Sequence, residues 1–166
     1  MSHSMGDQLN NDEIAKNFFD KGYLLQKNGH LDRAAHFYKR SIEFCPSAQA
    51  HTFLGWVYSL KGLFDEAIEE CKNAINLDPD YGNPYNDIGA YLLQQHRYDE
   101  DKIGFQRALD APNYENYCYP FLNLGRVYEF KGDWDTALEC YKKAINENKD
   151  YEPAHVALKD LQAKYN

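Results

Sequence analysis

The sequence has little positive charge and no long apolar run, and each absence excludes a class of protein. Its 166 residues carry 18 Lys and Arg against 26 Asp and Glu, which gives a formal net charge of −8. Binding to the phosphate backbone relies on clustered Lys and Arg. We therefore expect no nucleic acid partner and no attraction to acidic membranes. No apolar run approaches the roughly 18 to 20 residues that span a bilayer, so membrane insertion is not expected either.

The N-terminal residues 1–13 lack the charged-then-apolar pattern of a signal peptide. They are polar, and we expect them to be disordered. The sequence therefore predicts a soluble, cytoplasmic protein, or a periplasmic one if a signal segment has been removed from the chain.

Residue patterns that carry chemistry are also missing. The cysteines Cys45, Cys71, Cys118 and Cys140 form no CxxC pair and have no histidine nearby at metal-ligand spacing, so we expect buried thiols. The histidines show no HExxH spacing, and there is no Walker-type loop or GxGxxG. His51 falls in a core position, which favours a packed imidazole over a ligand. The sequence predicts no enzyme, no metal and no cofactor.

What the sequence does contain is an internal repeat of about 34 residues. Four glycines, Gly22, Gly55, Gly89 and Gly125, are separated by 33, 34 and 36 residues. A second position follows each glycine and is small in three repeats; it holds Ala34, Ala67, Asp101 and Ala137. A bulkier residue stands four positions later, namely Tyr38, Cys71, Phe105 and Tyr141. Such spacings describe one face of a helix.

Each repeat therefore predicts two helices joined by a tight turn. Gly29, Gly62 and Gly132 occupy the turn, where a positive φ is usually required. Small residues on both helices let antiparallel backbones approach closely. The expected pairs are 14–28 with 31–44, 48–61 with 64–77, 83–95 with 98–110, and 117–131 with 134–147.

Two runs, LGWVYSLKGLFDEAIEECKNAINLDPDY and LGRVYEFKGDWDTALECYKKAINENKDY, resemble the tetratricopeptide-repeat (TPR) family. The resemblance implies an all-α, right-handed superhelical solenoid, of bacterial origin, with a concave binding groove. It implies one domain over residues 14–166, with repeats at about 15–47, 48–81, 82–117 and 118–151. A capping helix is expected at about 152–164.

The third repeat departs from this pattern, because Asp101 and Lys102 stand where Ala and an aliphatic residue are expected. A buried carboxylate is costly unless it is paired. Either the helix is rotated to use Ile103 instead, or Asp101 has a hydrogen-bond partner. The long connection DAPNYENYCYP that follows resembles the joint of bacterial pilus-assembly and envelope-associated members of the family.

In the family, the first helix of each pair lines the concave wall, so its exposed positions are candidate ligand contacts. The N-terminal half of this wall is aromatic, and the C-terminal half offers Asn and Arg side chains that could bind a peptide backbone or carboxylate. The candidate groove residues are Phe19, Tyr23, Thr52, Trp56, Asn83, Asn86, Tyr119, Asn123 and Arg126. Two alternatives stay open: the aromatic residues pack between repeats, or Arg126 pairs with Glu129.

The predicted function is that of an adaptor or assembly factor that binds a peptide or protein segment in the groove. The alternatives are a self-assembling homo-oligomeric scaffold and a secretion-type chaperone for an apolar segment. An RNA-binding helical repeat conflicts with the acidic charge. Family members that hold chaperone C-termini resemble one another in a clamp of Lys and Asn residues. Here those positions hold Phe19, Tyr23, Phe53, Asn83 and Asp87, so binding of such tails is not expected.

Overall fold

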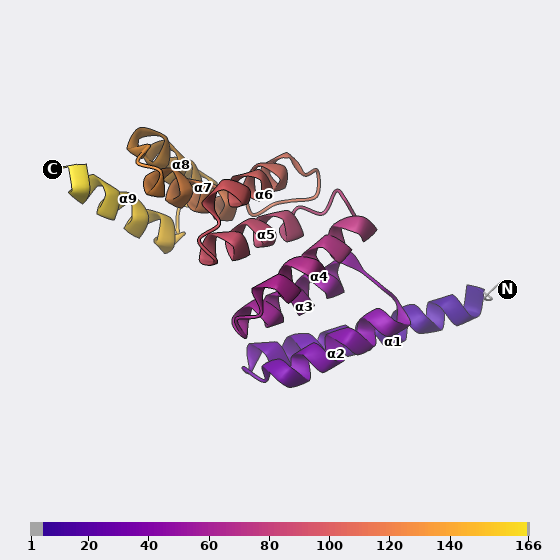
Figure 1. Cartoon of the computed structure of the whole chain (residues 1–166). Helices are drawn as coiled ribbons and strands as arrows, with labels where there is room; N and C mark the ends of the chain where they lie inside the picture. The colour runs from indigo at the N-terminus through magenta and orange to yellow at the C-terminus, as the bar shows by residue number, and fades with distance from the viewer. Residues whose placement is uncertain (1–4, 166) are drawn as a thin grey trace. The chain divides into compact units, whose positions relative to one another are not determined.

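The protein is described by a computed structural model that covers the backbone of residues 5–165 and the side chains of residues 10–97 and 102–164. Within these residues the chain is helical, and its only extended contact is a bridge between Tyr81 and Asn113. The helices, labelled in Figure 1, are α1 (Met5–Lys27), α2 (Leu31–Phe44), α3 (Ala48–Leu60), α4 (Phe64–Leu77), α5 (Asn83–Gln94), α6 (Tyr98–Asp110), α7 (Cys118–Phe130), α8 (Trp134–Glu147) and α9 (Glu152–Tyr165).

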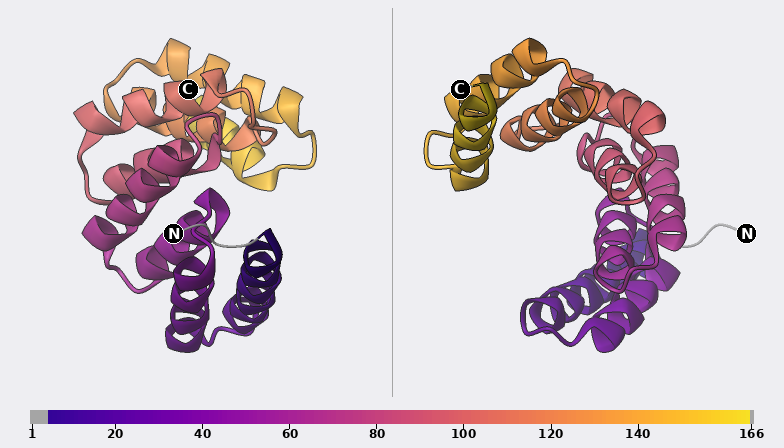
Figure 2. Two further views of the ribbon diagram at one scale, coloured as in Figure 1. Left: turned by 90° about the vertical axis from the view of Figure 1, so that its right-hand side faces the viewer. Right: turned by 60° about the vertical axis from the view of Figure 1, so that its left-hand side comes forward.

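The helices group into two compact units that divide after Pro79. Unit 1 holds α1 to α4 and unit 2 holds α5 to α9. In each unit consecutive helices pair, α1 with α2 and α3 with α4, then α5 with α6 and α7 with α8 (Figure 2). The ninth helix, α9, packs on both α7 and α8. The predicted helix-turn-helix pairs and the terminal helix are therefore present.

The turns inside the pairs have the predicted backbone. Gly29, Gly62 and Gly132 have φ values of 78°, 76° and 77°, a region that L-residues with a Cβ atom rarely adopt. In the third repeat the same place is taken by His96, with φ 60°. Left-handed backbone costs a non-glycine residue roughly 1 kcal/mol, so this turn is the least favourable of the four.

The small positions predicted from the repeat lie where two helices touch. Ala34, Ala67 and Ala137 are fully buried. A Cβ atom added to Gly125 would lie 2.3 Å from the ring of Tyr141, and one on Gly22 would lie 2.9 Å from the ring of Tyr38. The glycines therefore make room for the bulky residue of the same repeat, which the described structure buries completely in each case: Tyr38, Cys71, Phe105 and Tyr141.

The third repeat does not follow the alternative in which α6 is rotated toward Ile103. The Asp101 side chain lies outside the described residues, and Ile103 is 59% exposed, so α6 is not rotated to bury Ile103. Instead Gly104 faces α5, because a Cβ atom there would lie 2.7 Å from the carbonyl oxygen of Tyr85. The missing side chain of Gly104 lets the two backbones approach and leaves Ile103 outside.

Helix α1 corrects the expected disorder of residues 1–13, because it begins at Met5 and includes residues 5–13. This stretch contains no proline or β-branched residue that would oppose a helix. The helix is held by its next turn: Ala15 is buried, and its carbonyl oxygen accepts a hydrogen bond of 2.8 Å from Ser41 on α2. Residues 1–4 lie outside the description.

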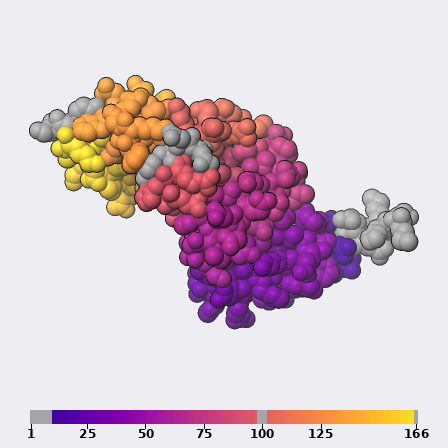
Figure 3. All heavy atoms as spheres, viewed as in Figure 1, coloured from indigo at the N-terminus to yellow at the C-terminus, as the bar shows by residue number. Residues whose placement is uncertain are grey.

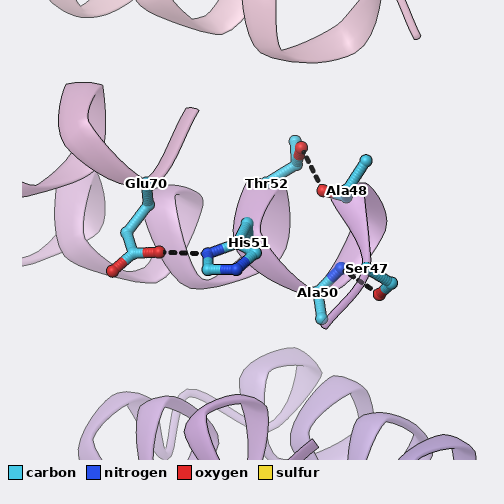
Figure 4. A network of polar contacts seen from close by, with 6 residues as sticks. All are labelled: Ser47, Ala48, Ala50, His51, Thr52 and Glu70. Atoms are coloured by element: carbon cyan, nitrogen blue, oxygen red, sulfur yellow. Dashed lines mark hydrogen bonds and ion pairs between the residues drawn. The ribbon is translucent and has the colours of Figure 1, made fainter. Parts of the chain in front are cut away.

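Helix α3 is fixed at its start and along its side by polar contacts (Figure 4). Ser47 caps it by accepting a hydrogen bond of 3.1 Å from the Ala50 N–H. One residue later, Nδ1 of the half-buried His51 lies 2.6 Å from Oε2 of Glu70 on α4. The predicted packed imidazole thus also joins the two helices of its pair.

The core follows the repeat within each unit. In unit 1, Tyr38, Leu54 and Val57 are almost fully buried, and in unit 2, Phe105 and Val127 are fully buried. Figure 3 shows the heavy atoms as spheres, coloured along the chain from unit 1 to unit 2. All four cysteines are thiols; three are buried, while Cys45 is partly accessible.

Candidate interaction surfaces

Unit 1 presents aromatic side chains on its first helices. Tyr23 on α1 is 43% exposed and Trp56 on α3 is 46% exposed. The ring of Phe53 lies between them, with centroids 5.9 Å from Tyr23 and 6.0 Å from Trp56, and Phe19 lies 5.1 Å from Phe53. We call these four residues the aromatic surface. The two half-buried phenylalanines hold the exposed rings of Tyr23 and Trp56 in place.

The rings of the aromatic surface are arranged edge to face. The planes of Tyr23 and Trp56 stand at 68° and 67° to that of Phe53, an edge-to-face arrangement that stabilises aromatic pairs. Lys27 lies 5.7 Å above the Tyr23 ring, and Leu60, one turn after Trp56, is 54% exposed. An apolar surface with a cation at its edge results.

Two other polar residues on the first helices of unit 1 serve the unit's own structure. Thr52, a predicted groove residue, is only 4% exposed, and its hydroxyl donates to the Ala48 carbonyl at 2.8 Å. Gln26 is 8% exposed, and its Oε1 accepts a hydrogen bond of 2.7 Å from the hydroxyl of Tyr38. Thr52 is therefore not positioned to contact a ligand.

Unit 2 has a hollow of about 520 Å³ between α7 and α9. Its lining combines charged side chains with a short apolar strip. The lining residues include Arg126, Glu129, Pro153, Val156, Asp160 and Lys164. Val156 is 50% exposed. A partner side chain placed here would meet both apolar surface and charge.

Glu129 is occupied within unit 2. Its carboxylate accepts hydrogen bonds of 2.7 Å from Tyr141 and 2.5 Å from Lys164 of α9. Burial raises the pKa of Glu129, but the bonds from Lys164 and Tyr141 outweigh it and leave the pKa below its ordinary value. Arg126 donates a long hydrogen bond of 3.4 Å to Oδ1 of Asn123. Lys164 thus forms the ion pair with Glu129 that was the alternative role of Arg126, although the charge of Arg126 also lowers the pKa of Glu129.

The remaining predicted groove residues of unit 2 differ in their accessibility. Tyr119 on α7 is 44% exposed, with its ring 5.3 Å from that of Tyr151. Asn83 and Asn123 are half-buried, whereas Asn86 is 9% exposed. Helix α7 therefore brings together Tyr119, Asn123 and Arg126.

Sequence reasoning missed the contribution of α9. The helix was expected only to cap the fold, yet Val156, Asp160 and Lys164 line the hollow beside α7. The signal was present, because this segment begins like the first helix of a fifth repeat. Its side chains therefore fall on the same kind of face as those of α7.

The chain is built from pairs of helices, and each pair spans about one repeat. Tight turns with a left-handed backbone join the two helices of a pair. This arrangement defines a helical repeat protein. Comparison with known families agrees: the tetratricopeptide-repeat family matches residues 15–47, 48–81 and 121–153, which together make up more than half of the chain. The chain belongs to this family, whose repeats serve protein–protein interaction.

Several relatives are similar over most of the chain. The type IV pilus assembly protein PilF of Pseudomonas aeruginosa is 29% identical over 149 residues, 86% of this chain and 56% of PilF. A solved PilF structure superposes with a TM-score of 0.86 at 25% identity and covers 94% of this chain and 71% of that one. A Haemophilus influenzae protein is 27% identical over 70% of this chain and 55% of its own.

The structure of MamA also matches, with a TM-score of 0.72 at 25% identity over 90% of this chain and 81% of that one. The chain spans about half the length of the H. influenzae protein and of PilF. Among the described residues, none of the helices combines the length and apolar character needed to cross a membrane, and no three His, Cys, Asp or Glu side chains lie together as a metal site would require.

Proposed function

We propose that the chain is an assembly factor that binds a segment of another protein through the first helices of its repeats. The observation that carries this proposal is the exposure of Tyr23 and Trp56 on a surface whose other rings hold them in place. Exposed aromatic residues held rigidly lose little side-chain entropy on binding, and Trp, Tyr and Arg dominate binding energy at protein interfaces.

Each unit offers one kind of contact to a partner segment. The aromatic surface of unit 1 receives apolar side chains. Arg126, which is exposed and bonded only weakly to Asn123, receives a carboxylate or a backbone carbonyl in unit 2.

The relatives support an assembly role. PilF is by its name a type IV pilus assembly protein, and the structure that resembles this chain comes from its functional characterisation.

The experiment selects binding segments from a displayed random peptide library on the full chain and measures their affinities by titration calorimetry. Trp56→Ala and Arg126→Ala should each weaken binding about tenfold or more, which corresponds to roughly 1.4 kcal/mol. The matched controls are Leu77→Ala and Ile103→Ala, which truncate exposed apolar residues on second helices and should leave affinity unchanged.

Circular dichroism must show unchanged helicity for all four variants. Equal affinities for the Trp56→Ala and Leu77→Ala variants would contradict the proposal. Light scattering on the free chain separates binding of a foreign segment from self-assembly, because a scaffold would show a mass that rises with concentration.

A further inference from the structure

Helix α5 carries two adjacent polar groups, Asn86 and Asp87, that are mostly removed from water. The Asn86 Nδ2 donates to Oδ1 of Asp87 at 3.4 Å. Asn86 is only 9% exposed, and its Oδ1 has no hydrogen-bond partner within the described part of the chain. The pair therefore presents three acceptor oxygens and only one long internal hydrogen bond. Buried acceptors without donors are rare because each costs free energy.

The surroundings of this pair do not neutralise it. Burial raises the pKa of Asp87 to about 7, and the bond from Asn86 lowers it only in part. The phenol of Tyr114, from the connection between α6 and α7, is 4% exposed; its pKa is raised by burial first and then by the Asp87 charge. A carboxylate with little access to water and no cation beside it is strongly stabilised in its ionised form by a cationic partner.

We propose that Asn86 and Asp87 receive an arginine guanidinium from the bound protein segment, an inference that rests on the function proposed above. A guanidinium presents its five N–H donors in a planar fork. Two of them can satisfy the carboxylate of Asp87 side by side. Oδ1 of Asn86 has almost no accessible surface in the unbound chain, so a third N–H reaches it when the Asn86 side chain turns toward the ligand. An ammonium group has no such planar fork, so arginine is preferred over lysine.

The net charge of the chain, −8, agrees with a basic partner. In unit 2 the arginine site on α5 and the cation Arg126 on α7 then demand opposite charges of the segment. A bound segment thus carries an arginine and, separately, an acceptor for Arg126. These two requirements determine which segments bind and in which direction the segment runs along unit 2.

The test uses N-acetylarginine amide as a probe and N-acetylcitrulline amide as its neutral, nearly isosteric control. Each is titrated into the isotopically labelled full chain, and the Asn86 side-chain amide and the Asp87 carboxyl carbon are followed by NMR. The arginine compound should shift both signals in a saturable way, the citrulline compound should not, and Asp87→Asn should abolish the effect. Equal shifts with citrulline, no saturable shift with arginine, or shifts that persist in Asp87→Asn would overturn the inference.

This outcome is separable from that of the proposed function. Asp87→Asn keeps the size and shape of the side chain, and its amide spectrum shows whether the fold is retained. Library-selected segments that depend on Trp56 but contain no arginine, and that bind Asp87→Asn with unchanged affinity, would refute the arginine site while leaving the proposed function standing.

Discussion

The two units contain the same internal hydrogen bond in two chemical forms. In unit 1, the buried Tyr38 donates to the neutral Gln26, twelve residues earlier. In unit 2, Tyr141 donates to Glu129, also twelve residues earlier, and Glu129 in addition binds Lys164 of α9. Burial raises the pKa of both phenols. The difference teaches that the tyrosine hydrogen bond of unit 1 involves neutral groups alone. In unit 2 the acceptor is charged, and its charge also attaches the last helix, α9.

The middle repeats show why the hydroxyl and its acceptor occur together. Their bulky positions hold Cys71 and Phe105, and the positions twelve residues earlier hold Ser59 and Leu93. The two repeats that have no tyrosine at the bulky position also have no amide or carboxylate acceptor twelve residues earlier. A buried hydroxyl without an acceptor, or the reverse, leaves an unsatisfied polar group.

The largest expected effect comes from adding a methyl group to the glycine that faces each tyrosine. Gly125→Ala should destabilise the protein by about 2–3 kcal/mol, because the new Cβ would lie 2.3 Å from the buried ring of Tyr141. Gly22→Ala should cost less, about 1 kcal/mol, since its contact with Tyr38 is 2.9 Å. Urea unfolding measures both. Equal losses would show that the two interfaces are equally tight.

Next in size is a pH effect confined to unit 2. The raised pKa of Asp87, about 7, means that ionising it costs stability as the pH rises from about 4 to 7. Asp87→Asn should therefore stabilise the protein at neutral pH by on the order of 2 kcal/mol, and the gain should fade toward about pH 4. Urea unfolding across this range checks it. A gain that does not depend on pH would contradict the burial of this carboxylate.

Removing the phenol of unit 1 should have a somewhat smaller effect. Tyr38→Phe leaves both polar atoms of the buried Gln26 side chain without a partner, so a loss of about 1–2 kcal/mol is expected. Hydrogen exchange of the amides in α1 and α2 locates the loss. The double variant Tyr38→Phe with Gln26→Leu should recover part of the stability, and failure to recover any would mean that the hydroxyl contributes by packing alone.

The smallest expected effect on the free energy of unfolding comes from removing the charge of Glu129 in unit 2. At neutral pH Glu129→Gln weakens the contact with Lys164 and should cost about 0.5–1 kcal/mol. Because the pKa of Glu129 is lowered in the folded protein, its contribution exists above the ordinary glutamate pKa and is lost as the pH falls through the folded value. Wild type and variant should therefore converge in acid. A constant difference at all pH values would assign the effect to shape rather than charge.

The repeat made most of the fold predictable. Glycines at a period of about 34 residues, with Ala34 and Tyr38 as examples of the positions that follow, fixed the helix pairs and their turns, because those positions are needed wherever two helices touch. The rotation of α6 toward Ile103 was a wrong alternative, because the periodic pattern does not show that Gly104 can bring the two backbones together and leave Ile103 outside. The predicted start of the first helix, residue 14, was too late. Residues 5–13 are polar, and a polar stretch resembles a disordered segment.

The candidate sites were less predictable, for a different physical reason. Exposure of Tyr23 and Trp56 followed from their place on the first helices. That Thr52 is buried, or that Lys164 reaches Glu129 from thirty-five residues away, depends on how side chains of separate repeats fill space. A periodic pattern gives the face of a helix on which a residue lies, but not the neighbour that covers it.

The most direct test of the account maps a library-selected segment onto the chain by amide chemical-shift perturbation. The account predicts that the shifted amides belong to the first helices, around Trp56 of unit 1 or around Arg126 of unit 2. Perturbations that fall instead on the second helices, α2, α4, α6 and α8, would contradict it.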